Sequence, residues 1–159
     1  NVIGCVGSEK KAELARAAGC SHTILYNSED VAARVLDITN GRGVPVSYDS
    51  VGQATLQASL DSLAPTGTLI SFGNASGPIL DLNPGILAAS GSLYLQRPTL
   101  ATYTRNRELL EAVSGDLFNV VRSGKVKINV GQTYPLSDAV RAHRDLEGRK
   151  TTGSAILLP

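Results

Sequence analysis

The chain has 159 residues, of which 42% are hydrophobic, 18% charged and 4% aromatic. Fifteen Lys and Arg residues against fourteen Asp and Glu residues give a formal net charge of +1, so no charge excess favours nucleic acid or a membrane surface as a partner. This composition is typical of a globular domain and excludes disordered, collagen-like and low-complexity chains. No apolar run approaches the roughly 18 residues of a membrane span.

The chain begins with Asn1 in an apolar run and has no charged leader, so we expect it to be part of a longer chain. Two cysteines, Cys5 and Cys20, are too few for a disulfide framework or a thiolate metal cage. His22 and His143 lie far apart in the sequence, which argues against a metal site. These features favour a cytoplasmic protein with buried or half-buried thiols.

In the first half of the chain, short apolar runs alternate with helical patterns. Strands are expected at residues 1–7, 22–26 and 44–51. Helices are expected after Ser8, at residues 29–39 and around Leu56, Leu60 and Leu63, with Gly19 and Asn40-Gly41 ending the first two.

The second half continues the alternation after a turn at residues 65–67. Strands are expected at residues 68–73, 92–96, 127–134 and 154–158, and helices at 86–89, 105–123 and 137–147. The longest helix is expected to bury its apolar side chains, which are Leu109, Leu110, Val113, Leu117, Val120 and Val121. The whole pattern predicts one α/β domain over residues 1–159, with a doubly wound, Rossmann-like parallel sheet.

Ligands of such sheets bind beyond the carboxyl ends of the strands, where the first candidate site is Gly7-Ser8-Glu9-Lys10-Lys11. The strand ends without the acid that would accept the ribose 2′-hydroxyl of NAD. A hydroxyl at Ser8 and a cation at Lys11 suit the 2′-phosphate of NADP instead. The alternative is that Ser8 only caps the helix and the lysines form a solvated face.

Two further strand ends carry candidate residues. In Tyr48-Asp49-Ser50-Val51-Gly52, Ser50 offers a hydroxyl to a ribose or phosphate, or else Asp49 simply caps a turn. After the next strand, a polar loop exposes amides that suit a carboxamide, or else forms a plain surface connection. Its sequence is Ser71-Phe72-Gly73-Asn74-Ala75-Ser76-Gly77. No catalytic acid–base set or nucleophile pair stands out.

These motifs resemble those of the bacterial NADPH:quinone oxidoreductases, which are zinc-free, zeta-crystallin-like members of the medium-chain dehydrogenase/reductase superfamily. The resemblance runs through the whole chain in order. It also includes Gly91-Ser92-Leu93-Tyr94-Leu95-Gln96-Arg97-Pro98-Thr99, Tyr134-Pro135-Leu136, Ala142-His143-Arg144 and Arg149-Lys150-Thr151-Thr152-Gly153-Ser154.

The resemblance implies NADPH as cofactor, a quinone as substrate and no metal. It assigns the 2′-phosphate to Ser8 and Lys11, and the adenine end to Tyr26. Ser50 would contact the ribose–phosphate region, while Arg149 would close over the bound dinucleotide. The residues implied for the nicotinamide half are Phe72, Gly73, Asn74 and Leu95. The stretch Leu93-Tyr94-Leu95-Gln96-Arg97 is implied to continue a sheet across a homodimer.

One departure from the family pattern is the absence of its catalytic domain, first strand and Gly-rich turn ahead of Asn1. In a doubly wound sheet that strand lies in the middle, so its two neighbours are expected to lack a shared partner. The fragment alone is therefore expected to have little reductase activity.

Three other functions remain open. The first is an enone or alkenal reductase of the same superfamily, and the second is a non-catalytic, crystallin-like nucleotide-binding protein. The third is RNA binding, which this charge and aromatic content disfavour, because it needs cationic grooves and stacking rings.

Overall fold

The computed structural model describes all 159 residues as two compact units, Asn1–Leu100 and Ala101–Pro159. The first unit contains β1 (Ile3–Val6), α1 (Glu9–Ala17), β2 (His22–Leu25), α2 (Val31–Ile38), β3 (Val44–Asp49), α3 (Leu56–Asp61), β4 (Leu63–Ser71), α4 (Gly85–Ala89) and β5 (Tyr94–Gln96). After α5 (Leu100–Tyr103), the second contains α6 (Arg107–Arg122), β6 (Val130–Pro135), the 3-10 turn η1 (Leu136–Asp138), α7 (Ala139–Glu147) and β7 (Ser154–Leu158). That residues 1–159 act as one domain stays a prediction.

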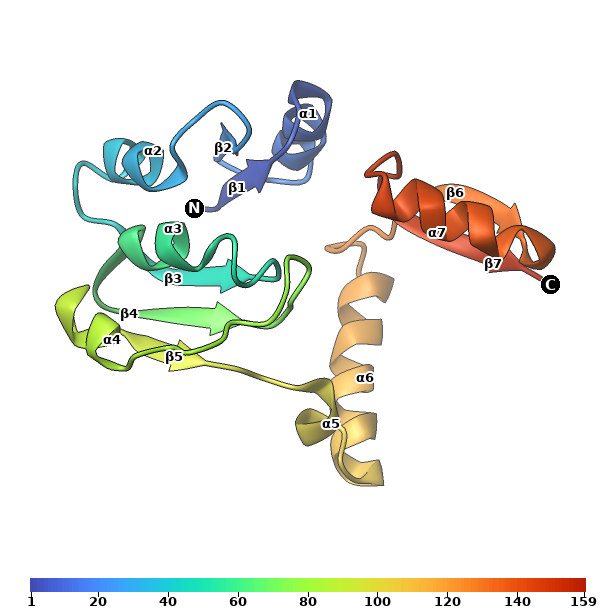
Figure 1. Cartoon of the computed structure of the whole chain (residues 1–159). Helices are drawn as coiled ribbons and strands as arrows, with labels where there is room; N and C mark the ends of the chain where they lie inside the picture. The colour runs from blue at the N-terminus through green and yellow to red at the C-terminus, as the bar shows by residue number, and fades with distance from the viewer. The chain divides into compact units, whose positions relative to one another are not determined.

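Every strand pair in the structure is parallel, which confirms the predicted α/β class. The first unit holds a two-stranded sheet, β1-β2, and a three-stranded sheet, β3-β4-β5, whose arrows run side by side in Figure 1. The second unit holds the pair β6-β7. β1 and β3 do not pair with each other, as expected for two strands that lack a shared neighbour.

Local signals place the first helices as predicted. Ser8 is the N-cap of α1, where its Oγ accepts the N–H of Lys11 at 3.4 Å. The helix ends at Ala17 and is followed by Gly19 at φ +107°, a conformation that glycine adopts without strain. α2 is capped by Asp30, whose Oδ1 accepts the N–H of Ala33 at 3.0 Å.

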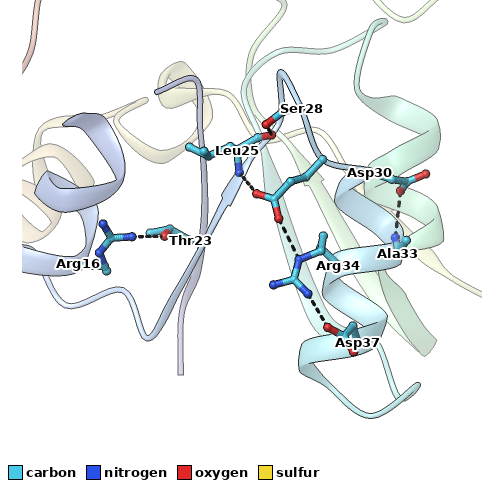
Figure 2. Close-up of polar contacts among 9 residues, drawn as sticks. Arg16, Thr23, Leu25, Ser28, Asp30, Ala33, Arg34 and Asp37 are labelled. Atoms are coloured by element: carbon cyan, nitrogen blue, oxygen red, sulfur yellow. Dashed lines mark hydrogen bonds and ion pairs between the residues drawn. The ribbon is translucent and has the colours of Figure 1, made fainter. Parts of the chain in front are cut away.

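The connection from β2 to α2 is held by Glu29 (Figure 2). One of its carboxylate oxygens accepts the N–H of Leu25 at 2.6 Å, and the other accepts Nε of Arg34 at 3.0 Å. Arg34 also pairs with Asp37 on the same helix. The carboxylate thus satisfies a backbone donor at the end of a strand that pairs on one side with β1.

The core of the first unit forms between the β3-β4-β5 sheet and its covering helices. Leu60, Leu63, Leu69 and Leu93 are buried together there. Leu63 was expected on the helix but is the first residue of β4, where it pairs with Val44. The predicted turn at residues 65–67 lies inside β4 as an irregularity of the register, because pairing resumes only at Thr68.

The prediction that α6 buries its apolar residues was wrong. No residue of α6 is buried, and Leu110, Val113, Leu117 and Val120 are between 39% and 55% exposed. The helical period fixes an apolar stripe but not the element that covers it. The expectation for the thiols was right for half-buried Cys20 and wrong for Cys5, which is exposed. None of the helices combines the length and the apolar character needed to cross a membrane.

Candidate functional site

The carboxyl ends of β1 and β2 meet at Gly7 and Tyr26. A Cβ atom at Gly7 would lie 2.6 Å from Oη of Tyr26, so the phenol rests against the glycine backbone. Nδ2 of Asn27 donates to the carbonyl oxygen of Gly7 at 2.8 Å. The parallel register that pairs Val6 with Leu25 produces this meeting.

Ser8 and Lys11 follow the same strand end, Ser8 as the N-cap of α1 and Lys11 in its first turn. Because helix N-termini carry unpaired N–H groups and a positive dipole end, a hydroxyl and an ammonium there suit an anion. Ser8 caps the helix, as the alternative interpretation expects, and its contact with a 2′-phosphate stays a prediction. Figure 1 shows α1 following directly from β1.

Asp49, the last residue of β3, organises the turn that leads to α3. Oδ1 accepts the N–H groups of Val51 and Gly52 at 2.7 and 3.0 Å, and Oδ2 accepts the hydroxyls of Thr55 and Ser59 at 2.6 and 2.7 Å. Burial acts to raise the pKa of Asp49, but these hydrogen bonds outweigh it, and the pKa lies below its usual value. The capping role expected for Asp49 is therefore confirmed.

The loop after β4 packs against this turn at very short range. A Cβ atom at Gly73 would lie only 2.2 Å from the carbonyl oxygen of Ser50. The N–H of Phe72 donates to the backbone carbonyl oxygen of Asp49 at 2.8 Å, and the N–H of Ser76 donates to that of Val51 at 2.8 Å. The strand ends of β3 and β4 thus form one connected backbone surface.

A pocket of about 270 Å³ lies at the carboxyl ends of β4 and β5. Its lining residues are Ser71, Asn74, Pro78, Ile79, Leu82, Leu95 and Arg97. Nη1 of Arg97 donates to the carbonyl oxygen of Ser71 at 2.7 Å. The pocket is thus mostly apolar, with amide and guanidinium groups on its wall.

The structure divides the predicted site residues into three groups. Ser8, Lys11 and Tyr26 belong to the ends of β1 and β2. Ser50, Phe72, Gly73, Asn74 and Leu95 belong to the ends of β3, β4 and β5, and Asn74 and Leu95 line the pocket.

Arg149 belongs to the second unit, between α7 and β7. It adopts φ +56°, and its N–H donates to the carbonyl oxygen of Leu146 at 3.0 Å. Its closure over a dinucleotide stays a prediction.

Sequence reasoning assigned no individual role to Asn27 or to Arg97. Asn27 follows Tyr26 directly, and Arg97 follows the strand residues Tyr94–Gln96, so both stand at the strand ends where ligands of parallel sheets bind. That position was the available signal, but their partners, Gly7 and Ser71, are distant in sequence.

No three His, Cys, Asp or Glu side chains of this chain lie together in a group able to hold a metal ion. The residues of this chain therefore do not fit a zinc site.

Comparison with known proteins identifies related sequences and structures. Residues 18–157 match the family described as zinc-binding dehydrogenase. A quinone oxidoreductase of Pseudomonas aeruginosa is 50% identical over 99% of this chain and 49% of its own length. A 2-haloacrylate reductase of Burkholderia sp. is 46% identical over 99% of this chain and 48% of its own length.

Among solved structures, the chain is similar to Escherichia coli quinone oxidoreductase complexed with NADPH. The TM-score is 0.94 at 47% identity, over 99% of this chain and 49% of that one. The resemblance to quinone oxidoreductases is thereby confirmed. The chain spans about half the length of the curated relatives that it matches.

Proposed function

Because this chain belongs to the zinc-binding dehydrogenase family, we propose that it supplies most of the cofactor-binding domain of an NADPH-dependent quinone oxidoreductase. In this proposal the whole protein transfers reducing equivalents from NADPH to a quinone. NADPH, when bound, supplies the hydride, and the residues of this chain bind and orient it. The chain alone is expected to be inactive, since it spans only 49% of the length of the quinone oxidoreductase of Pseudomonas aeruginosa that it matches.

The observation that carries the cofactor assignment is the cluster at the ends of β1 and β2. Ser8 and Lys11 offer a hydroxyl and a cation at a helix N-terminus, and no acid stands at the end of β1. An acid there would accept the 2′-hydroxyl of NAD and repel the extra phosphate of NADPH. Tyr26, packed against Gly7, presents a 41% exposed ring for the adenine end.

The nicotinamide half is assigned to the strand ends of the other sheet. Gly73 lies directly against the backbone of Ser50, which joins the ends of β3 and β4, and Ser50 would contact the ribose–phosphate region there. Asn74 and Leu95 line the pocket proposed for the planar ring, and Phe72, which is 51% exposed, follows the end of β4 directly. Arg149 would close over the bound cofactor.

The test is steady-state kinetics of the full-length protein with 1,4-benzoquinone and either NADPH or NADH. Quinone-dependent NADPH oxidation with the higher kcat/KM for NADPH would support the proposal. Equal use of both cofactors would contradict the assignment of Ser8 and Lys11. NADPH binding without turnover of any acceptor would favour a non-catalytic, crystallin-like role.

A second candidate function is the reduction of an activated alkene. It is favoured by the 46% identity to a protein named 2-haloacrylate reductase, whose named substrate is an unsaturated acid. Comparing kcat/KM for 1,4-benzoquinone, a simple enone and 2-chloroacrylate in the same assay separates the two functions. The resemblance also predicts a reaction without zinc, which is checked by activity after dialysis against a chelator.

The edge strand β5 and the two cysteines bear on the assembly and the location of the protein. We expect a homodimer in which β5, which pairs within the chain only with β4, continues the sheet into a second copy. A cytoplasmic location is supported by the two free thiols, Cys5 and Cys20.

A further inference from the structure

Arg97 connects two strand ends that are not adjacent in sequence. It follows β5 directly, and its Nη1 donates at 2.7 Å to the carbonyl oxygen of Ser71, the last residue of β4. Ser71 is only 3% exposed, so the guanidinium satisfies a carbonyl group on a buried residue. A charged donor makes this hydrogen bond stronger than one between neutral groups.

The same guanidinium reaches the loop that follows β4. In the orientation of the Asn74 amide that satisfies both of its ends, Oδ1 accepts Nη2 of Arg97 at 3.2 Å. Nδ2 of Asn74 then donates to the carbonyl oxygen of Gly73 at 2.8 Å. Arg97 therefore selects which end of the Asn74 amide faces it.

The opposite side of this loop is fixed by backbone contacts. Gly73 lies against Ser50, and the N–H of Ser76 donates to Val51 at 2.8 Å. The loop is thus held on the β3 side by the turn after that strand and on the β5 side by the fork of Arg97. Asn74 and Arg97 both line the pocket at the carboxyl ends of β4 and β5.

We propose that Arg97 is a positioning residue, which orients the Asn74 amide and fixes the pocket wall against which the nicotinamide of the cofactor is placed. This inference rests on the proposed function, because it requires that NADPH binds at this pocket. Arg97 acts through Asn74 and Ser71. It sets geometry, and the 2′-phosphate contacts that we assign to Ser8 and Lys11 come from the other parallel sheet of the unit.

The test uses Arg97→Met and Arg97→Lys in the full-length protein. Methionine keeps an unbranched apolar stem and removes both donors, whereas lysine keeps the charge but cannot fork to two acceptors. For Arg97→Met we expect kcat with 1,4-benzoquinone to fall about 10- to 100-fold, because small misplacements of reacting groups have effects of this size. The Kd for NADPH should rise by a smaller factor than kcat falls, since the 2′-phosphate contacts assigned to Ser8 and Lys11 come from the β1-β2 sheet and stay in place.

A readout independent of turnover is the fluorescence anisotropy of NADPH bound at saturation. A loosened pocket wall leaves the nicotinamide more mobile, so Arg97→Met should lower the anisotropy. The anisotropy of Arg97→Lys should lie between that of Arg97→Met and that of the wild type. If Arg97→Met fails to fold, the lysine variant carries the same test. Arg107→Met is the matched control, because it removes an equally charged, exposed side chain on α6 that pairs with Glu111.

A double-mutant cycle with Asn74→Ala tests whether Arg97 acts through Asn74. If it does, the kcat of the double variant should be no lower than that of Asn74→Ala alone. If the two residues act independently, the two fold-reductions in kcat should multiply. Wild-type kcat and anisotropy in Arg97→Met, or multiplied effects in the double variant, would overturn the inference. A wild-type protein that binds NADPH but reduces no quinone would instead contradict the proposed function and leave the anisotropy test of Arg97 intact.

Discussion

A Cβ atom added to Gly73 would lie 2.2 Å from the carbonyl oxygen of Ser50, closer than any side chain can be placed. The other nearest atoms, C and Cα of Ser50, also belong to the backbone, so the contact cannot be relieved by a change of side-chain rotamer. The contact joins the ends of β3 and β4, on which the proposed nicotinamide half of the site is built.

Gly73→Ala is therefore expected to displace the loop after β4. The free energy of unfolding should fall by about 1–3 kcal/mol, the usual effect of overpacking, and NADPH should bind more weakly. Urea unfolding and fluorescence titration of the full-length protein check both effects. Gly115→Ala is the matched control, since no atom beyond its chain neighbours and the backbone of α6 itself lies within 4 Å of its Cβ position. It should stabilise the protein by about 0.5–1 kcal/mol, and equal destabilisation by both variants would argue against a specific contact.

Lys11→Ala is expected to remove most of the preference for NADPH over NADH. A charge-assisted contact to the 2′-phosphate corresponds to a preference of roughly 1–3 kcal/mol in binding free energy. The measurement is a fluorescence titration of the full-length protein with each cofactor. Lys10→Ala, one residue earlier and exposed, should leave the preference unchanged. If Lys11→Ala kept the wild-type preference, Lys11 would be an ordinary surface lysine.

Asp49 predicts a specific pH dependence of stability. Its pKa in the folded state is lowered from an unfolded value of about 3.9. The carboxylate therefore contributes stability above that unfolded value, and the contribution is lost as the pH falls through the folded pKa. In urea unfolding, the free energy of the wild type should decline below about pH 4, and that of Asp49→Asn should decline less steeply.

Above pH 4, Asp49→Asn should be less stable by about 1–3 kcal/mol, because an amide presents one acceptor oxygen to donors that now share two. Asp61→Asn is the control, since Asp61 is exposed and accepts only Gln57 Nε2 at 2.8 Å among the described hydrogen bonds. A pH profile of Asp49→Asn that parallels the wild type would mean that other carboxyl groups dominate acid unfolding.

Tyr94→Lys tests the proposed dimer through β5. Tyr94 is 64% exposed, and paired copies of β5 would bring the two introduced lysines close together. Like charges on neighbouring strands destabilise the pairing, so sedimentation equilibrium should show a higher dissociation constant for the dimer. Ala17→Lys adds the same charge on the exposed end of α1 and should not change it. An unchanged assembly in Tyr94→Lys would place the interface elsewhere.

Local patterns were sufficient for the order of the elements. The first helix lies between Ser8 and Gly19, and the final strand covers residues 154–158, both as expected. These limits are predictable because caps and apolar runs act over a few neighbouring residues. Boundaries failed where packing intervened, as at Leu63, which pairs with Val44 in a strand instead of extending a helix. Position at a strand end was also enough to select Ser8 and Lys11 as candidates, whereas Tyr26 and Asn74 were assigned individually only by the family resemblance.

The sequence by itself determined the α/β class, the parallel connections and the strand ends at which ligand-binding residues stand, because each depends on hydrophobic period and turn chemistry within short windows. The tertiary structure alone decided that Gly73 touches Ser50, that Tyr26 rests on Gly7 and that Arg97 holds Ser71 and Asn74. These contacts join residues 19 to 26 positions apart, across strands whose register is set by the packing of the whole sheet. The hydrophobic periodicity of the sequence does not specify which residues so far apart come into contact.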